Sequence, residues 1–202
     1  MNNREWVFLG PLPSFLPSYV ENLPTIAIDG GAKYNLSPDI WVGDADSHVG
    51  NVNTPHQFVH PKEKDQSDLG LGLSLIEAKS NITLHFFGFL GGRHDHELFN
   101  FGEASSFLIH RQNSEVRFYN SSGDLLFRFL SPGKWIFEHQ GIFSLGTFYE
   151  SKVTLSGECQ YKIPPNTTLH PLSSYGLSNR GEGKIEVQTS APVFLYFPKD
   201  VE

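Results

Sequence analysis

The stretch that decides the fold reads ITLHFFGFLGGRHDH and covers residues 82–96. Its first six residues, Ile82 to Phe87, are mostly apolar, which is typical of a short buried strand. Three glycines follow within five residues, and a helical pattern then runs from about Asp95 to Arg111. A strand, a glycine-rich turn and a helix in this order predict an α/β domain in which a phosphate can approach the N–H groups at the helix start.

The residues before this stretch also alternate between short apolar runs and helical patterns. Short apolar runs at 6–9, 25–28 and 40–42 predict three more buried strands, because each is followed by Gly or Asp. Ser67 is expected to cap a helix whose apolar stripe consists of Leu69, Leu73 and Ile76. A second stripe, on the helix from about Asp95, consists of Leu98, Phe101, Ala104 and Leu108. Residues 1–121 are therefore predicted to form a Rossmann-like α/β domain with a largely parallel sheet.

The pattern changes at the turn-rich stretch Asn120–Gly123. Beyond it, Leu125 to Phe129, Trp135 to Phe137 and Ile185 to Val187 alternate with polar neighbours, as half-buried strands do. No convincing helical pattern follows. Residues 122–202 are therefore predicted to form an all-β antiparallel sandwich domain.

Composition excludes several classes of protein. The net charge is −7 and the pI is about 5.7, which argues against a nucleic-acid binder. No apolar run approaches the length of a membrane span, and no charged-then-apolar leader is recognised, so we expect no membrane association and a cytoplasmic location. The single cysteine, Cys159, excludes an internal disulfide.

Four segments carry aspartates, and each comes after a predicted strand in the order of the chain. They are Asp29-Gly30-Gly31-Ala32, Gly43-Asp44-Ala45-Asp46-Ser47, Lys64-Asp65-Gln66-Ser67-Asp68 and Gly91-Gly92-Arg93-His94-Asp95-His96. Because ligands of open α/β sheets bind at the carboxyl ends of the strands, one shared site is expected. Asp44 and Asp46, with Asp68, are candidate Mg²⁺ ligands, since Mg²⁺ prefers oxygen donors. An aspartate-rich turn and a helix-dipole partner are the simpler alternatives.

The glycine segment offers a candidate phosphate site. Glycines beside a helix start allow close approach of a phosphate, and Arg93 would add a bidentate clamp. His96 and Asn100 lie four residues apart and share a helix face. The simpler alternative is a glycine turn in which Arg93 forms a surface ion pair with Asp95.

Taken together, the four segments resemble the motifs of the thiamine pyrophosphokinase family in the same order. Asn100 completes the last motif, and Gly176-Leu177-Ser178-Asn179 resembles the family's C-terminal G-x-S-N. The resemblance implies an α/β nucleotide-binding domain followed by a β-sandwich, a homodimer, and transfer of diphosphate from ATP to thiamine with release of AMP. It implies Mg²⁺ as cofactor, and thiamine and ATP as small-molecule partners.

The resemblance also assigns roles to residues. Asp44, Asp46 and Asp68 would hold Mg²⁺, Asp95 would approach the thiamine hydroxyl, and Arg93 would grip phosphate oxygens. The nucleotide would be contacted by Asp29, Gly30, Gly31, Lys64, Asp65, Ser67, Gly91, Gly92, Arg93, His96 and Asn100. Thiamine would be contacted by Tyr161, Ser178 and Asn179. Two alternatives stay open, namely a related diphosphokinase acting on a hydroxymethyl pterin and a non-catalytic ligand-binding module.

Overall fold

The computed structural model describes residues 4–33, 37–44, 53–61 and 65–199. The predicted site residues Asp46 and Lys64 lie outside these ranges. The chain divides into two compact units, of which unit 1 comprises Met1–Ala78, Ile82–Glu103 and Val116–Leu125. Unit 2 comprises Lys79–Asn81, Ala104–Glu115 and Leu126–Glu202. The predicted domain boundary between residues 121 and 122 stays a prediction.

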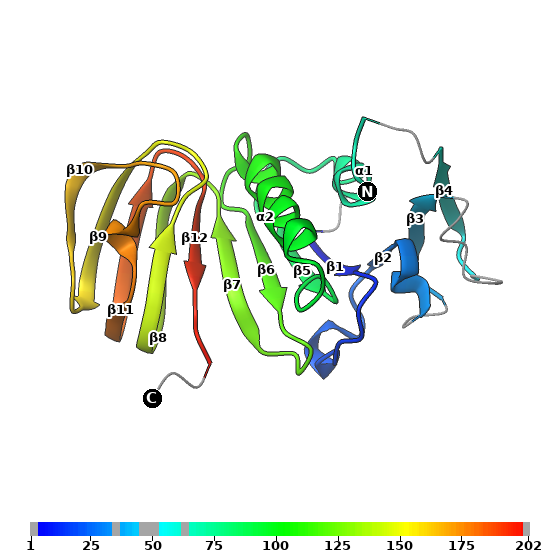
Figure 1. Cartoon of the computed structure of the whole chain (residues 1–202), viewed down its shortest axis with the longest axis horizontal. Helices are drawn as coiled ribbons and strands as arrows, with labels where there is room; N and C mark the ends of the chain where they lie inside the picture. The colour runs from blue at the N-terminus through cyan, green and yellow to red at the C-terminus, as the bar shows by residue number, and fades with distance from the viewer. Residues whose placement is uncertain (1–3, 34–36, 45–52, 62–64, 200–202) are drawn as a thin grey trace. The chain divides into compact units, whose positions relative to one another are not determined.

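Unit 1 is built on parallel strands (Figure 1). They are β1 (Glu5–Leu9), β2 (Thr25–Ile28), β3 (Ile40–Asp44), β4 (His56–His60) and β5 (Thr83–Phe87). β1 pairs in parallel with β2 and β5, β2 with β3, and β3 with β4. In the strand order β4 is outermost at one side, and β6 (Glu115–Tyr119) lies beside β5. The four predicted strands and their parallel pairing are confirmed.

β4 was missed by the sequence analysis. Its residues are exposed except for the half-buried His60, so they carry no apolar pattern that marks a buried strand. β4 pairs in parallel with β3 in the register Ile40 to His56 through Asp44 to His60. The core on one face of the sheet includes Val7, Trp41 and Phe87.

Two α-helices occur among the described residues, α1 (Asp68–Ser74) and α2 (His94–Leu108). Ser67 is the N-cap of α1 as predicted, since its Oγ accepts the Gly70 N–H at 2.9 Å. The expected stripe of α1 is buried at Leu69, Leu73 and Ile76. α1 contacts β2 and β3. The expected stripe of α2 is wrong at Leu98, which is 52% exposed.

The protein is mostly β, and the Rossmann-like description is not confirmed. The other helical segments in the described ranges are short 3₁₀ turns, namely η1 (Ser18–Val20), η2 (Asp29–Lys33) and η4 (Ser174–Gly176). Thus β1 and β2 are joined through η1 without an α-helix. The described part of the connection from β2 to β3 contains η2 and likewise no α-helix. None of the helices in the described ranges has the length and apolar content needed to cross a membrane.

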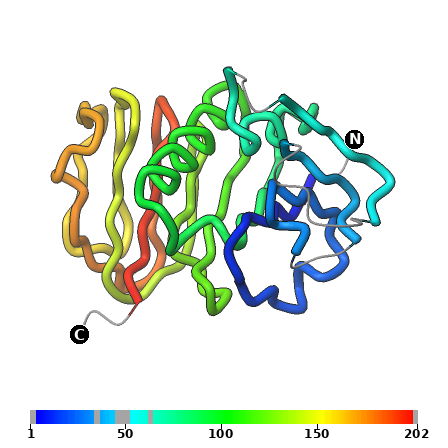
Figure 2. The backbone as a smooth tube through the Cα atoms, turned by 45° about the vertical axis from the view of Figure 1, so that its right-hand side comes forward, coloured from blue at the N-terminus to red at the C-terminus, as the bar shows by residue number. Residues whose placement is uncertain are grey.

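Unit 2 is antiparallel. Its strands are β7 (Leu125–Leu130), β8 (Gly133–Gly146), β9 (Ser151–Cys159), β10 (Ile163–Leu169), β11 (Asn179–Thr189) and β12 (Val193–Tyr196), with β7 entering the unit at Leu126. They run side by side in Figure 2, where those from β9 onward are coloured yellow to red. β8 pairs with β11 along residues 133–143 and with β12 at 144–146. The antiparallel pairing predicted for this half is confirmed.

The side chains between these strands form one apolar core. It contains Leu130, Phe143, Leu155, Ile185 and Leu195, which come from five different strands. After Gly123, where no convincing helical pattern was found in the sequence, the described residues contain one short 3₁₀ turn, η4, and no α-helix.

Candidate active site

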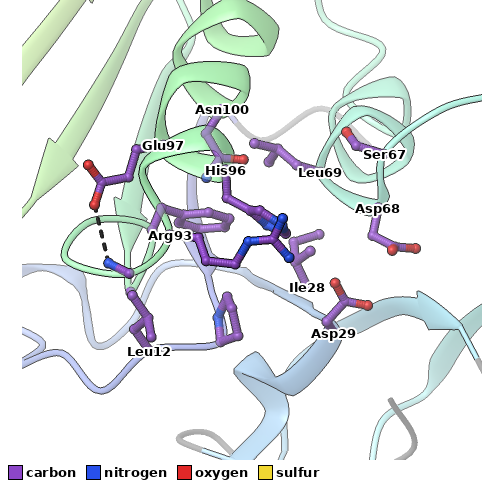
Figure 3. A pocket seen from close by; sticks show the side chains of 14 residues that line it. Leu12, Ile28, Asp29, Ser67, Asp68, Leu69, Arg93, His96, Glu97 and Asn100 are labelled. Atoms are coloured by element: carbon purple, nitrogen blue, oxygen red, sulfur yellow. Dashed lines mark hydrogen bonds between the residues drawn. The ribbon is translucent and has the colours of Figure 1, made fainter. Parts of the chain in front are cut away.

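A cavity of about 490 Å³ opens in unit 1 (Figure 3). It lies where β1, β2 and β5 end and where α1 and α2 begin, as expected for a site at the carboxyl ends of parallel strands. Its volume is within the range of small-ligand pockets. The lining residues are Pro11, Leu12, Ile28, Asp29, Ser67, Asp68, Leu69, Gly88, Phe89, Gly92, Arg93, His96, Glu97 and Asn100.

Seven of the residues predicted for the nucleotide or metal site line this cavity. They are Asp29, Ser67, Asp68, Gly92, Arg93, His96 and Asn100, drawn from three of the four aspartate segments. Gly30, Gly31, Asp65, Gly91 and Asp95 are not among the lining residues. Asp44 of the fourth segment is the half-buried last residue of β3 and is also not among them.

Two carboxylates face the same side of the cavity. Figure 3 shows Asp29, at the end of β2, and Asp68, in the first turn of α1, directed toward one another, with the Arg93 guanidinium extended toward them. Such oxygen donors suit Mg²⁺ when phosphate oxygens and water complete the octahedron. Within the described ranges no three His, Cys, Asp or Glu side chains group closely enough to hold a metal ion. The Mg²⁺ triad, whose member Asp46 lies outside those ranges, stays a prediction.

Arg93 and Asp95 form the ion pair that the sequence analysis named as an alternative. Arg93 Nη2 lies 2.5 Å from Asp95 Oδ2, and Arg93 Nε donates to Asp95 Oδ1 at 3.1 Å. The pKa of Asp95 is lowered to about 2, chiefly by the side-chain hydrogen bond from Arg93 and also by the N–H of His96, which donates to the carboxylate. The same bond raises the pKa of Arg93. At neutral pH both groups are therefore charged.

Glu97 is a lining residue that the sequence analysis missed. Its Oε1 accepts the N–H of Gly91 at 2.5 Å and the N–H of Gly92 at 3.2 Å. These are the two amides that were expected to bind phosphate. The available signal was spacing, because a glutamate in the first turns of a helix can reach back to N–H groups at its start.

Ser67 joins the two helices that border the cavity. Besides capping α1, its hydroxyl donates to Glu103 Oε1 of α2 at 3.0 Å. One hydroxyl therefore fixes the start of α1 and ties it to α2. This bond holds Asp68, the next residue, at the edge of the cavity.

The residues predicted to bind the acceptor lie in unit 2. Tyr161 and Asn179 line a hollow of about 360 Å³, together with Tyr175 and Leu177. Tyr161, Tyr175 and Leu177 are each more than half exposed. Ser178 is not among the lining residues, and its N–H donates to Ser144 Oγ at 3.0 Å.

Asn179 is 3% exposed and its amide is engaged with the protein. Its Oδ1 accepts the N–H of Tyr161 at 3.0 Å and that of Arg180 at 2.8 Å, while Nδ2 donates to the Tyr161 carbonyl at 2.6 Å. Asn179 thus fixes the backbone that presents the Tyr161 ring.

Comparisons with known proteins point in one direction. A family model described as thiamin pyrophosphokinase, catalytic domain, matches residues 18–118. The solved thiamine pyrophosphokinase from Bacillus subtilis is 21% identical, with a TM-score of 0.74 over 98% of this chain and 99% of that chain. A thiamin pyrophosphokinase family protein from Enterococcus faecalis is 18% identical, with a TM-score of 0.70 over 98% of this chain and 100% of that chain.

A more distant solved structure agrees with these two. The thiamin pyrophosphokinase from Candida albicans is 15% identical, with a TM-score of 0.67 over 96% of this chain and 88% of that chain. At such identities the likeness shows the fold. The comparison with curated proteins gave no match.

Proposed function

Since the chain belongs to the thiamine pyrophosphokinase family, we propose that it transfers diphosphate from ATP to the hydroxyl of thiamine, giving thiamine diphosphate and AMP. The observation that carries the proposal is the cavity of unit 1, where residues of three separate aspartate segments meet. A chance clustering of these segments would not select the carboxyl ends of the strands, where α/β sheets bind ligands.

The nucleotide is assigned to this cavity. Arg93 offers a planar, permanently charged fork for phosphoryl oxygens. Asp29, Ser67, His96 and Asn100 supply polar groups around the nucleotide. Lys64 and Asp65 belong to the same proposal because they complete the motif that ends at Asp68, and Gly30 and Gly31 because they follow Asp29.

Mg²⁺ is proposed as the cofactor. Asp68, with Asp44 and Asp46, would hold it, and when bound it would neutralise charge on the polyphosphate. Asp68 supports this proposal, because it brings a hard oxygen donor to the cavity edge, and Asp29, the residue after β2, adds a second carboxylate nearby. The protein's own contribution is to hold these carboxylates on one side of the cavity and Arg93 on the other.

Asp95 is proposed to orient the acceptor. In the reaction the thiamine hydroxyl oxygen bonds to the β-phosphorus, the bond from that phosphorus to the α–β bridging oxygen breaks, and AMP leaves. The hydroxyl proton passes through Asp95 to solvent. With a pKa of about 2, Asp95 stays ionised and accepts a hydrogen bond from the hydroxyl, but it holds the proton only late and briefly.

The acceptor ring is assigned to the hollow of unit 2, where Tyr161 and Tyr175 present exposed aromatic side chains. Aromatic faces attract organic cations, and the thiazolium ring of thiamine is one. The proposal includes a homodimer in which unit 2 of one subunit serves the cavity of the other, and a cytoplasmic location. Ser178 and Asn179 are assigned to the same acceptor site, Asn179 through its hold on Tyr161.

The proposal is tested by incubating the purified protein with Mg-ATP and thiamine and measuring AMP and thiamine diphosphate. A parallel incubation with a hydroxymethyl pterin separates the related diphosphokinase activity. Asp95→Asn should reduce turnover by about 10²-fold or more with nucleotide binding nearly unchanged. Glu150→Gln is the matched control, because Glu150 is a surface carboxylate of unit 2 that lies beside His170. Absence of AMP with either acceptor would leave only a ligand-binding module.

A further inference from the structure

The glycine turn after β5 already holds an anion, and that anion is a side chain of the protein. Gly91 has φ +90, a left-handed conformation, and the consecutive N–H groups of Gly91 and Gly92 converge on Glu97 Oε1. Successive amides arranged in this way form a concave anion site. Here the site is occupied by a carboxylate from the helix that follows the turn.

Glu97 is also less exposed than the neighbouring ionisable side chains Arg93, His94 and Asp95. Its side chain is 22% exposed, compared with 72% for Arg93, 51% for Asp95 and 99% for His94. A carboxylate that is largely removed from water and accepts two N–H bonds is costly to displace. The contact is therefore a lasting part of the turn.

The direction of Glu97 separates it from the proposed polyphosphate position. In Figure 3 its carboxylate points away from Asp29 and Asp68, toward the turn, and the dashed line marks its bond to the turn backbone. Arg93 directly follows the turn and extends toward the aspartates. Fixing the two glycines thus fixes the backbone from which the Arg93 side chain starts.

We infer that Glu97 is a positioning residue that holds the Gly91–Gly92 turn and thereby sets Arg93 over the cavity. This inference rests on the proposed function and refines it, because the polyphosphate is then gripped by Arg93 and not by the two glycine amides. Without this contact the backbone that carries Arg93 and its partner Asp95 would have to be ordered by the ligand, which lowers affinity.

The test compares Glu97→Ala, Glu97→Gln and, as a control on the same helix, Leu98→Ala, whose side chain is 52% exposed and outside the cavity. Calorimetry gives the Kd of Mg-ATP and of inorganic pyrophosphate, and steady-state kinetics give kcat and KM. Glu97→Ala should weaken both ligands and raise KM for Mg-ATP about tenfold, with a smaller change in kcat. Glu97→Gln should rescue most of the loss, because its amide oxygen still accepts an N–H.

A second readout concerns the turn itself. In ¹⁵N-labelled protein the Gly91 amide proton should resonate downfield because of its short bond to a carboxylate, and it should keep that shift when Mg-ATP saturates the protein. In Glu97→Gln the resonance should move upfield. Leu98→Ala should match the wild type in both readouts.

Two results would overturn the inference. Tighter pyrophosphate binding by Glu97→Ala, with a large Gly91 shift on Mg-ATP addition to the wild type, would show that the carboxylate competes with phosphate for the amides. Unchanged binding by Glu97→Ala would show that the turn does not position Arg93. If the wild type binds neither Mg-ATP nor pyrophosphate, the proposed function has failed instead.

Discussion

Ser67→Ala should destabilise unit 1 measurably, although the serine is exposed. The change removes the N-cap of α1, where Ser67 Oγ accepts the Gly70 N–H at 2.9 Å, and also the 3.0 Å bond to Glu103. Loss of a cap costs about 1 kcal/mol. An exposed hydrogen bond to a carboxylate adds about 0.5 kcal/mol. The sum of about 1.5 kcal/mol raises the unfolding equilibrium constant more than tenfold.

The assay is urea unfolding followed by tryptophan fluorescence. Trp6 and Trp41 are buried in unit 1, so a Trp135→Phe background removes the signal from unit 2. With a slope of about 2 kcal/mol/M, the midpoint should fall by about 0.7 M. Ser74→Ala is the matched control, because Ser74 lies at the other end of α1 and, among the described residues, donates to the Leu71 carbonyl of its own helix.

The result that would refute the reasoning is a Ser67→Ala midpoint within about 0.15 M of the Ser74→Ala midpoint, a difference of only about 0.3 kcal/mol. Ser67→Asp supplies a further check, since aspartate is an equally good cap but is repelled by Glu103. It should recover only part of the loss. Ser67→Ala should also weaken Mg-ATP binding, because Asp68 is the next residue and lines the cavity.

Two further predictions concern glycines and charge. Gly102→Ala should raise the free energy of unfolding by about 0.5–1 kcal/mol, because alanine favours the helix and its Cβ would meet nothing within 4 Å. Gly72→Ala should lower the free energy of unfolding in the same urea assay, because its Cβ would lie 2.7 Å from Ile28 Cδ1. Arg93→Gln should return the pKa of Asp95 from about 2 toward its ordinary 3.8, as measured by NMR titration of the carboxyl carbon. Because the folded-state pKa of Asp95 is lowered, the stabilisation from this ion pair is complete above the ordinary pKa and is lost as pH falls toward 2. Acidification from pH 7 to 5 should therefore leave this stabilisation unchanged. An Asp95 pKa that does not move in Arg93→Gln would exclude the ion pair as its cause.

Local patterns predicted the elements whose side chains are buried. The run Ile82–Phe87 contains β5, and the cap at Ser67 and the stripe of α1 are confirmed, because one apolar face is needed to cover the sheet. β4 escaped notice because an outer strand with exposed side chains needs no apolar period. Leu98 was misassigned because the period of α2 says which residues share a face, but not where the buried face begins.

The site was predictable to the extent that its residues belong to contiguous motifs. Asp29, Asp68 and Arg93 follow strands or begin helices, so the topology alone brings them together. Glu97 and the apolar wall at Leu12 and Phe89 were not predictable in this way, because their place depends on how the turns after β1 and β5 fold back. Likewise, only the structure shows that Asn179 acts on the backbone of Tyr161.

The outer position of β4 has a consequence for the resistance of the protein to aggregation at high concentration. Among the described strands β4 pairs with β3 alone, and the unpaired side of a strand can bind a strand of another molecule, which is a common start of aggregation. Two features of β4 limit such pairing. The strand has only five residues, and the next residue is Pro61, which has no N–H to donate to an added strand. Pro61→Val would add a backbone N–H to the edge of β4, and the protein should precipitate at a lower temperature on heating.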